Sequence, residues 1–239
     1  MIQSGISCIC CTTVERRWCL PLAIRCWQRQ TYVGRRELIV VFSGPGTVED
    51  LLPMDSRVRL VHAPATASLG QKHNLGVEAA SQPWLCKWDD DDWYAPRRLS
   101  FSMRIAQAND AEIVGTRALL FHELIEPRRT WLYEQTLTQP WLAGNTMLFH
   151  RDLWRRVPFP DRASGVDTVF VRDVLNPDKG HAKAVAFSDP GLCVLMVHGQ
   201  TTGRKIWNPK PPEYRLWPDT VDRILGADLT AYEGAFASR

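Results

Sequence analysis

The sequence predicts one α/β domain in which a mainly parallel, doubly wound sheet carries the functional residues at one edge. Three observations predict this class. The chain has 239 residues with 45% hydrophobic content, its first 110 residues alternate apolar runs with amphipathic segments, and four consecutive aspartates follow one apolar run. A chain of this length can bury one substantial core and is short for two full domains. Alternating strand and helix patterns are typical of parallel α/β sheets.

The elements of the first half follow from hydrophobic periodicity. Ile6 to Cys11 is a short apolar run typical of a buried strand, and residues 19, 22, 23, 26 and 27 form one apolar helix face. The next buried strand, residues 37–42, is closed by a Gly-Pro-Gly turn. Further strands are expected at residues 57–62 and 84–88, and helices at residues 70–80 and 96–109.

The second half has a looser pattern. Short strands are expected at residues 112–116, 146–150 and 192–198, a helix at 164–175, and a stretch rich in Pro and Trp at 207–218. The chain contains no internal repeat and no low-complexity segment. All of these elements fit within one domain.

Charge and cysteine content narrow the class of protein. The net charge of +3 is mild, so the chain lacks the dense basic patch of a dedicated nucleic-acid-binding protein, although an anionic substrate such as a nucleotide fits. The sequence predicts no secretion signal and no membrane span, because no run of about 18 apolar residues occurs. Seven cysteines without zinc-type spacing favour reduced thiols in a cytoplasmic protein.

The four aspartates at residues 89–92, called the acidic run below, are the strongest functional signal. They follow a strand of apolar character, and open α/β sheets bind ligands at the carboxyl ends of their strands. Two carboxylates about 4 Å apart repel by roughly 4 kcal/mol at an effective dielectric constant of 20, so a hard divalent cation is expected nearby. The alternative is a solvated turn in which Asp92 caps the next helix. A phosphatase-type nucleophile site is excluded because Trp93 follows.

The segment from Asp89 to Leu99 resembles the Asp-x-Asp-Asp-x-Tyr-x-Pro-x-x-Leu motif of family 2 glycosyltransferases. Residues 6–13 resemble the first strand of that family, residues 30–32 its Gln-Thr-Tyr, and residues 70–76 its Gly-x-(Arg/Lys)-x-Asn-x-Gly loop. The motifs occur in the family's order between about residues 5 and 200.

The resemblance implies a GT-A fold, the Rossmann-like fold of nucleotide-diphospho-sugar transferases, as a single domain with a mixed central sheet over residues 1–239. Residues of about 5–115 would form the half that binds the nucleotide sugar, and about 116–200 the half that faces the acceptor. Residues 201–239 would be a C-terminal extension. The implied donor is a nucleotide sugar, with UDP as the leading nucleotide and GDP as the alternative.

The resemblance also assigns roles within the acidic run. Asp89 is implied in contacts with the donor, and Asp91 in coordination of Mn²⁺ or Mg²⁺ with support from Asp92. Asp90 is placed with the donor contacts, with a spectator role as the alternative. The cation would stabilise the charge that grows on the departing nucleoside diphosphate.

Four further residues are assigned to the donor. Lys72 matches a basic position near the nucleotide, or is a solvated lysine at a helix start. Thr12 and Thr13, at the end of the first strand, are expected to meet the nucleotide or to cap a turn. Ser43 stands where the family often has an Asp after its second strand, which leaves recognition of the base open.

The acceptor side departs from the family at one position. The family has Gly-Glu-Asp at a helix start, and this chain has Val166 in place of the Glu before Asp167. Asp167 is therefore the expected catalytic base, because one carboxylate within reach of the acceptor hydroxyl suffices for an inverting transfer. The alternatives are that Asp167 only stabilises the helix dipole, or that Asp173 is the base.

Two other segments resemble family motifs. Residues 141–146 resemble the loop that carries acceptor contacts, which implies Trp141, Gly144 and Asn145 in binding; packing in the core is the alternative for Trp141. Residues 198–202 resemble a His-Gly-x-Asn-Thr segment in which the histidine completes the metal shell. His198 is thus a second metal ligand, or else a satisfied structural residue.

The sequence predicts transfer of a sugar, with inversion, to a hydroxyl of a saccharide or of a hydroxylated base in phage-type DNA. For DNA, the arginines at 128–129 and 155–156 lie near Trp131 and Trp154, although amphipathic helix faces and ordinary tryptophan packing are the favoured explanation of these residues. A nucleotidyltransferase acting on a sugar phosphate is the second hypothesis. A binding protein that lost catalysis is the third, because of Ser43 and Val166.

Overall fold

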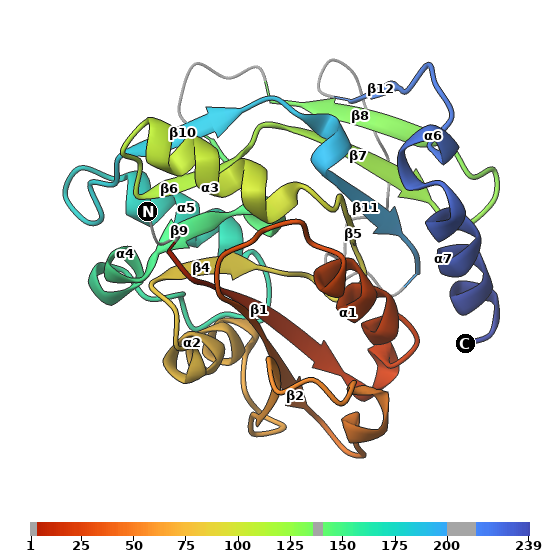
Figure 1. The fold of residues 1–239 in the computed structure, drawn as a ribbon, viewed down its shortest axis with the longest axis horizontal. Coiled ribbons are helices and arrows are strands. Elements are labelled where there is room, and N and C mark those ends of the chain that lie inside the picture. The colour runs from red at the N-terminus through yellow and green to blue at the C-terminus, as the bar shows by residue number, and fades with distance from the viewer. Residues whose placement is uncertain (1–3, 136–140, 200–213) are drawn as a thin grey trace.

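Strand β1 (Ile6–Thr13) is an interior strand of a seven-stranded sheet in the computed structural model, which describes residues 4–135, 141–199 and 214–239 (Figure 1). The strand order is β10-β6-β9-β4-β1-β2-β3. The other strands are β2 (Arg36–Ser43), β3 (Val58–His62), β4 (Trp84–Lys87), β6 (Ile113–Thr116), β9 (Leu148–His150) and β10 (Ala184–Phe187).

The first four strands are parallel, as the alternating pattern predicted. β1 pairs with β2 and with β4, and β2 pairs with β3, all in parallel register. β9 runs antiparallel to both β4 and β6, which makes the sheet mixed. The expected class, an α/β fold with a mixed central sheet, is therefore confirmed.

A five-stranded sheet adjoins it in the order β12-β8-β7-β11-β5. Its members are β5 (Trp93–Tyr94), β7 (Ala118–Glu123), β8 (Thr130–Glu134), β11 (Cys193–Val197) and β12 (Tyr214–Leu216). Of these strands only β11 was predicted, because β5 has only two residues and β7, β8 and β12 lie in the second half, where the pattern is looser. β5 directly follows the acidic run, so this sheet anchors the far side of the run.

Helices cover the sheets on both sides (Figure 1). They are α1 (Leu20–Gln28), α2 (Leu69–Ala79), α3 (Arg98–Ala108), α4 (Arg151–Arg156), α5 (Val166–Leu175), α6 (Asp222–Leu225) and α7 (Ala227–Ala237). The predictions for α1, α2, α3 and α5 are confirmed to within a few residues. α4, α6 and α7 were not predicted. None of the described helices combines the length and apolar character needed to cross a bilayer.

Local chemistry fixes where these helices begin and how closely they pack. Ser68 and Gln71 form a capping box at the start of α2, each side chain bonding the other's backbone N–H. Gly76 in the same helix lies against Ile9 and Val41, where a β-carbon would overlap them. A helix without a side chain at this position can approach the sheet more closely.

The core divides between the two faces of the sheet because successive residues of a strand point to opposite sides. Cys8 and Cys10 of β1 belong to one apolar cluster with α1 and α3, and Ile9 belongs to the other with α2 and α5. All seven cysteines carry free thiols, and only Cys11 is not fully buried.

The Gln-Thr-Tyr motif has a structural role. The amide of Gln30 donates to the carbonyls of Cys26 (3.0 Å) and Ala95 (2.9 Å) and accepts the backbone N–H of Leu99 (3.0 Å). The motif therefore ties the end of α1 to the start of α3, which follows the acidic run.

Candidate active site

The acidic run emerges from the carboxyl end of β4, beside the ends of β1 and β2. Thr13 and Ser43 are register partners at the ends of those two strands, and Thr12 and Ser43 are buried. The three residues assigned to the donor at these strand ends therefore lie on the same edge of the sheet as the aspartates. Their contact with a donor stays a prediction.

Lys72 lies in the first turn of α2 and faces the same edge. Its charge acts on Glu15, just beyond the end of β1, and on the thiol of Cys11. Burial raises the pKa of Cys11 to about 12, against the opposing charges of Lys72 and Lys87. The next residue, His73, points inward, and burial lowers its pKa well below the ordinary value. The motif thus presents its lysine, rather than its histidine, to the predicted donor side.

Asp89 is the most exposed member of the acidic run and is paired with a buried lysine. Lys87 Nζ lies 2.5 Å from Asp89 Oδ1, and the Asp89 backbone N–H donates to the Tyr94 hydroxyl at 2.9 Å. Burial alone would lower the pKa of Lys87, but the charges of Asp89 and Asp167 outweigh it and raise that pKa. Lys87 is therefore a buried cation acted on by both the run and the expected base, a role the strand pattern did not reveal.

Asp90 and Asp91 share one arginine. Arg16, the last residue of the 3-10 turn Val14–Arg16 after β1, donates from Nε to both carboxylate oxygens of Asp90 at 2.8 and 2.9 Å. Its Nη2 lies 2.6 Å from Asp90 Oδ1 and also pairs with Asp91 Oδ2. Arg16 was not predicted as a site residue, because it stands in an Arg-Arg pair with no distinguishing pattern.

His198 contacts the same oxygen of Asp91, with its Nε2 at 3.0 Å from Oδ2. The imidazole is buried and packs edge-on against Trp18, with ring centroids 5.1 Å apart. Burial opposes ionisation of Asp91, but the charge of Arg16 and the bond to His198 outweigh it and hold the pKa of Asp91 below its ordinary value. The two predicted metal ligands are thus neighbours. Residues 200–202 of the His-Gly motif lie outside the described residues.

Asp92 is held by neutral donors. It accepts from Asn145 Nδ2 at 2.8 Å and from the Met196 backbone N–H at 3.4 Å. Burial, followed by the charges of Asp91 and Asp89, raises its pKa well above the ordinary value. The side chain of Asn145 is bonded to Asp92 in the interior, so its predicted acceptor contact stays untested while a supporting role is observed.

A buried arginine supports the backbone beneath the run. Arg98 is fully buried and donates from Nη2 to the carbonyls of Lys87 (2.6 Å) and Asn145 (2.8 Å). Its guanidinium lies over the rings of Trp88 and Tyr94, at 4.7 and 3.9 Å from their centroids.

The C-terminal helix α7 also contacts the run. The Tyr232 hydroxyl donates to the carbonyl of Asp92 at 2.9 Å. Asp228 accepts from the indole of Trp93 at 2.7 Å and pairs with Arg29. A segment predicted only as an extension thus helps to fix the acidic run in place.

Asp167 occupies the first turn of α5 and faces Gly144. A β-carbon at Gly144 would overlap the Asp167 carboxylate, so these two predicted residues are in contact. Gly165 precedes the helix in the left-handed conformation with φ 64°, which suits glycine. Asp173 instead pairs with Lys179 at 3.0 Å and with Arg172 at 2.9 Å. The geometry favours Asp167 over Asp173 as the base.

Trp141 is half-buried and packs against the core, with its ring 5.5 Å from that of Tyr133 in an edge-on arrangement. Its role in stacking on an acceptor stays a prediction. One hollow of about 390 Å³ lies elsewhere, between the β7–β8 turn and the helices α6 and α7, and is lined by His122, Arg128 and Trp217 among others. Arg129, which the sequence analysis considered with Arg128 for contact with DNA, lines it too, but no residue assigned to the donor, the metal, the base or the acceptor loop does.

Few of the described side chains around Asp91 could ligate a divalent cation. Among the described residues no three His, Cys, Asp or Glu side chains converge as a metal cluster. Asp91 and His198 are a pair, and Mg²⁺ is commonly held by one or two carboxylates together with substrate phosphates. The pair therefore fits a cation whose remaining ligands come from a bound diphosphate and water.

Comparison with known proteins identifies the family of this chain. The family model described as glycosyl transferase family 2 matches residues 8–159, more than half of the chain. The chain belongs to glycosyl transferase family 2. The matched span includes the family 2 motifs around the acidic run and ends before Asp167 and His198. No match was found among curated proteins.

Solved structures share the fold. TarS 1–349 of S. aureus in complex with UDP has a TM-score of 0.62 at 13% identity, and its complex with UDP-GlcNAc has 0.64 at 12%. A mycobacterial protein has 0.55 at 14%. This chain is covered to 81% in each case, and it spans 60%, 59% and 65% of those chains. The family 2 chain thus has the GT-A fold and covers less than two thirds of each of these three chains.

Proposed function

We propose that this family 2 glycosyltransferase moves a sugar from a nucleotide-sugar donor to a hydroxyl acceptor with inversion, assisted by Mn²⁺ or Mg²⁺. The observation that carries the proposal is the pairing of Asp91 with His198, together with the contact of Asp167 with Gly144, whose neighbour Asn145 bonds Asp92 in the acidic run. In such a reaction Asp91 and His198 would hold the cation, and Asp167 would act as the base.

Each of these residues has a separate role in the proposed reaction. Asp91 and His198 would hold the cation, which when bound neutralises charge on the leaving diphosphate. Lys87 and Arg16 add fixed positive charge at the same strand ends. Asp167 would accept the proton of the acceptor hydroxyl as that oxygen attacks the anomeric carbon, while the bond to the diphosphate breaks on the opposite face.

The donor is proposed to be a UDP-sugar, with a GDP-sugar as the alternative. The TarS structures with UDP and UDP-GlcNAc support this choice only through the shared fold. Ser43, in the place of a common family Asp, is the residue expected to alter recognition of the base. Free thiols throughout the chain support a cytoplasmic site of action.

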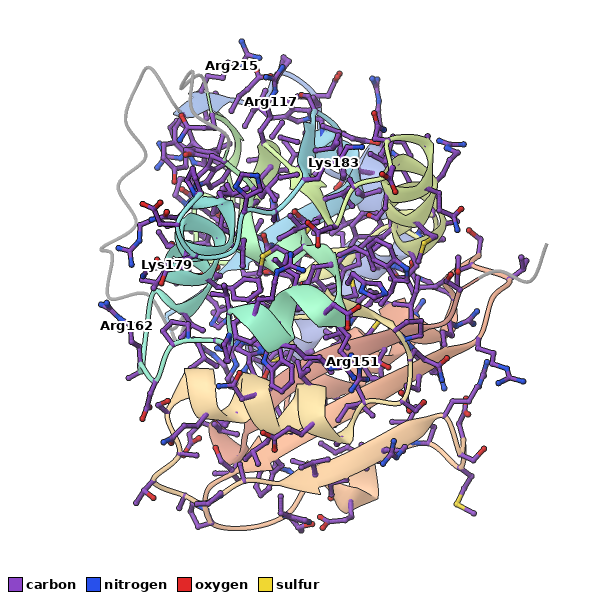
Figure 2. All side chains as sticks on the ribbon, turned by 90° about the vertical axis from the view of Figure 1, so that its left-hand side faces the viewer. Arg117, Arg151, Arg162, Lys179, Lys183 and Arg215 are labelled. Carbon is purple, nitrogen blue, oxygen red and sulfur yellow. The ribbon has the colours of Figure 1, made fainter. Side chains whose placement is uncertain are left out.

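The acceptor is proposed to be a saccharide hydroxyl rather than DNA. Figure 2 shows that the basic residues labelled on one face are spread over it rather than gathered in one patch. Three of them are paired with acids, Lys179 with Asp173, Lys183 with Asp110 and Arg215 with Glu134. Paired and scattered cations give a weak electrostatic footprint for a polyanion.

The test is product release from candidate donors. Incubation with UDP- and GDP-sugars and Mn²⁺ should release the nucleoside diphosphate, and a chelator should abolish that release. Release of pyrophosphate from a nucleoside triphosphate and a sugar phosphate would identify a nucleotidyltransferase instead. Donor binding without either product would identify a binding protein. Saccharide and hydroxymethylated-DNA acceptors, added in parallel, separate the two acceptor classes.

A further inference from the structure

Arg16 occupies the position where a cation would be needed. Its guanidinium bonds both oxygens of Asp90 and reaches Asp91 Oδ2, the oxygen that also contacts His198. Only 14% of the arginine side chain is exposed, so solvent screens these contacts weakly. One buried guanidinium therefore neutralises two adjacent carboxylates, one of which is the proposed metal ligand.

We propose that Arg16 is the resident counter-ion of the acidic run and competes with the divalent cation for Asp91. This proposal rests on the function proposed above. In the metal-free chain Arg16 holds both Asp90 and Asp91. In the loaded chain it keeps Asp90 through Nε and turns Nη2 from Asp91 to an oxygen of the donor diphosphate.

The competition follows from the geometry of Asp91. A guanidinium and a divalent cation that share one carboxylate oxygen repel each other, because both are positive and lie within a few ångströms. Arg16 Nε donates to both oxygens of Asp90, and these bonds keep the arginine in place when Nη2 releases Asp91. Arg16 thus stabilises the acidic run when no metal is bound and contacts the donor diphosphate when the metal is bound.

This arrangement predicts effects of opposite sign, which a purely structural arginine would not produce. Removal of Arg16 leaves Asp90 and Asp91 buried without their guanidinium, so the metal-free protein should lose thermal stability. The same removal ends the competition, so the affinity for Mn²⁺ alone should rise. The affinity for UDP in the presence of Mn²⁺ should fall, because a phosphate contact is lost.

The experiment compares R16Q with R17Q. Arg17 is the matched control because it follows Arg16 directly but pairs with the exposed Asp50 at 2.5 Å. Mn²⁺ binding without nucleotide is measured by electron paramagnetic resonance of free Mn²⁺, and melting is followed in chelator and in Mn²⁺. R16Q should bind Mn²⁺ about tenfold more tightly than wild type, the scale of one close charge pair. R17Q should match wild type.

The outcomes separate the two proposals. Wild type that binds no Mn²⁺, alone or with UDP, refutes the metal-dependent function. Wild type that binds Mn²⁺, with R16Q equal or weaker, overturns the competition at Asp91 alone. If R16Q does not fold, the same measurements are made on R16K. An ammonium keeps the charge but lacks the fork, so R16K should bind Mn²⁺ more tightly than wild type by a smaller factor, and equal or weaker binding overturns the proposal.

Discussion

Asp91 and Asp167 are carboxylates of one candidate site in contrasting environments. Asp91 is buried, and its Oδ2 is shared by Arg16 and His198. Asp167 is half-buried in the first turn of α5, where its Oδ1 accepts the backbone N–H of Thr168 at 2.9 Å. The first is clamped by cationic and imidazole partners, and the second lies at a helix start against a glycine.

The difference between the two environments suits two separate roles, ligation of a cation by Asp91 and general base catalysis by Asp167. A carboxylate that ligates a cation must stay ionised and fixed, which the surrounding charges accomplish for Asp91. A general base must be reachable by the acceptor and able to take up a proton, which a half-buried side chain at a helix start allows. Three substitutions test whether the two environments carry these separate tasks, and a fourth changes a carboxylate outside the site.

The largest effect is expected at the base. D167N should lower kcat by about 10²–10⁴-fold, because the acceptor hydroxyl loses its proton acceptor. The Kd for UDP should stay near the wild-type value, since Asp167 is assigned to the acceptor. Initial rates of diphosphate release and UDP titration measure the two quantities.

D173N is the matched control on the same helix. Asp173 pairs with Lys179 and Arg172, so its loss should leave kcat unchanged. If D173N lost as much activity as D167N, or D167N retained wild-type kcat, the assignment of the base to Asp167 would be wrong.

The second effect is at the proposed metal ligand. D91N should lower kcat by about 10²–10³-fold, the loss seen when one electrostatic stabiliser is removed. Unlike D167N, it should also weaken Mn²⁺ binding, which titration with Mn²⁺ and UDP measures. D110N is the control, because Asp110 is almost fully exposed. Full activity of D91N in the presence of a chelator would refute the metal assignment.

A third, smaller effect is expected at the contact between Gly144 and Asp167. G144A places a β-carbon on the Asp167 carboxylate and should displace it, with a loss in kcat of up to about 100-fold. Circular dichroism should show the fold retained. G234A in α7 is the control, since no atom lies within 4 Å of its added β-carbon. Equal kcat for G144A and wild type would show that Asp167 is not held by this contact.

The smallest effect on activity is expected at a carboxylate outside the site. Glu37, near the start of β2, accepts from Ser7 Oγ at 2.6 Å and from Ser81 N and Oγ at 2.5 and 2.8 Å. Burial alone would raise the pKa of Glu37, but these hydrogen bonds outweigh it and lower that pKa. E37Q should cost about 1–3 kcal/mol of unfolding free energy at neutral pH and leave kcat unchanged.

The pH dependence of this cost follows from the sign of the shift. A carboxylate with a lowered folded pKa stabilises the protein above its unfolded value, near 4.5, and loses that contribution as pH falls through the folded value. The difference between wild type and E37Q should therefore shrink below about pH 4. Denaturant unfolding at several pH values measures it, with the exposed Glu126 changed to Gln as the control. A difference independent of pH would contradict this account.

Local patterns let the sequence determine much of the first half. β1 to β4 and α1 to α3 carry strong periodicity, and the parallel strands bring their carboxyl ends to one edge whatever the loops do. The acidic run was therefore placed correctly from the sequence. The start of α5 was also foreseen, because a glycine followed by an apolar helix pattern marks it.

Only the tertiary structure decided which cations face the acids. Arg16 and Arg17 are adjacent and chemically identical, yet one bonds the acidic run and the other Asp50. In the sequence, Lys87 has the pattern of an ordinary strand residue, and α7 lies in a segment predicted only as an extension. In the fold, Lys87 pairs with Asp89, and Tyr232 of α7 bonds the carbonyl of Asp92. The pairs of Arg16 with Asp90 and of Tyr232 with Asp92 join residues 74 and 140 positions apart, so no local period encodes them. The sequence determined where the carboxylates gather, and the packing of distant elements decided what holds them.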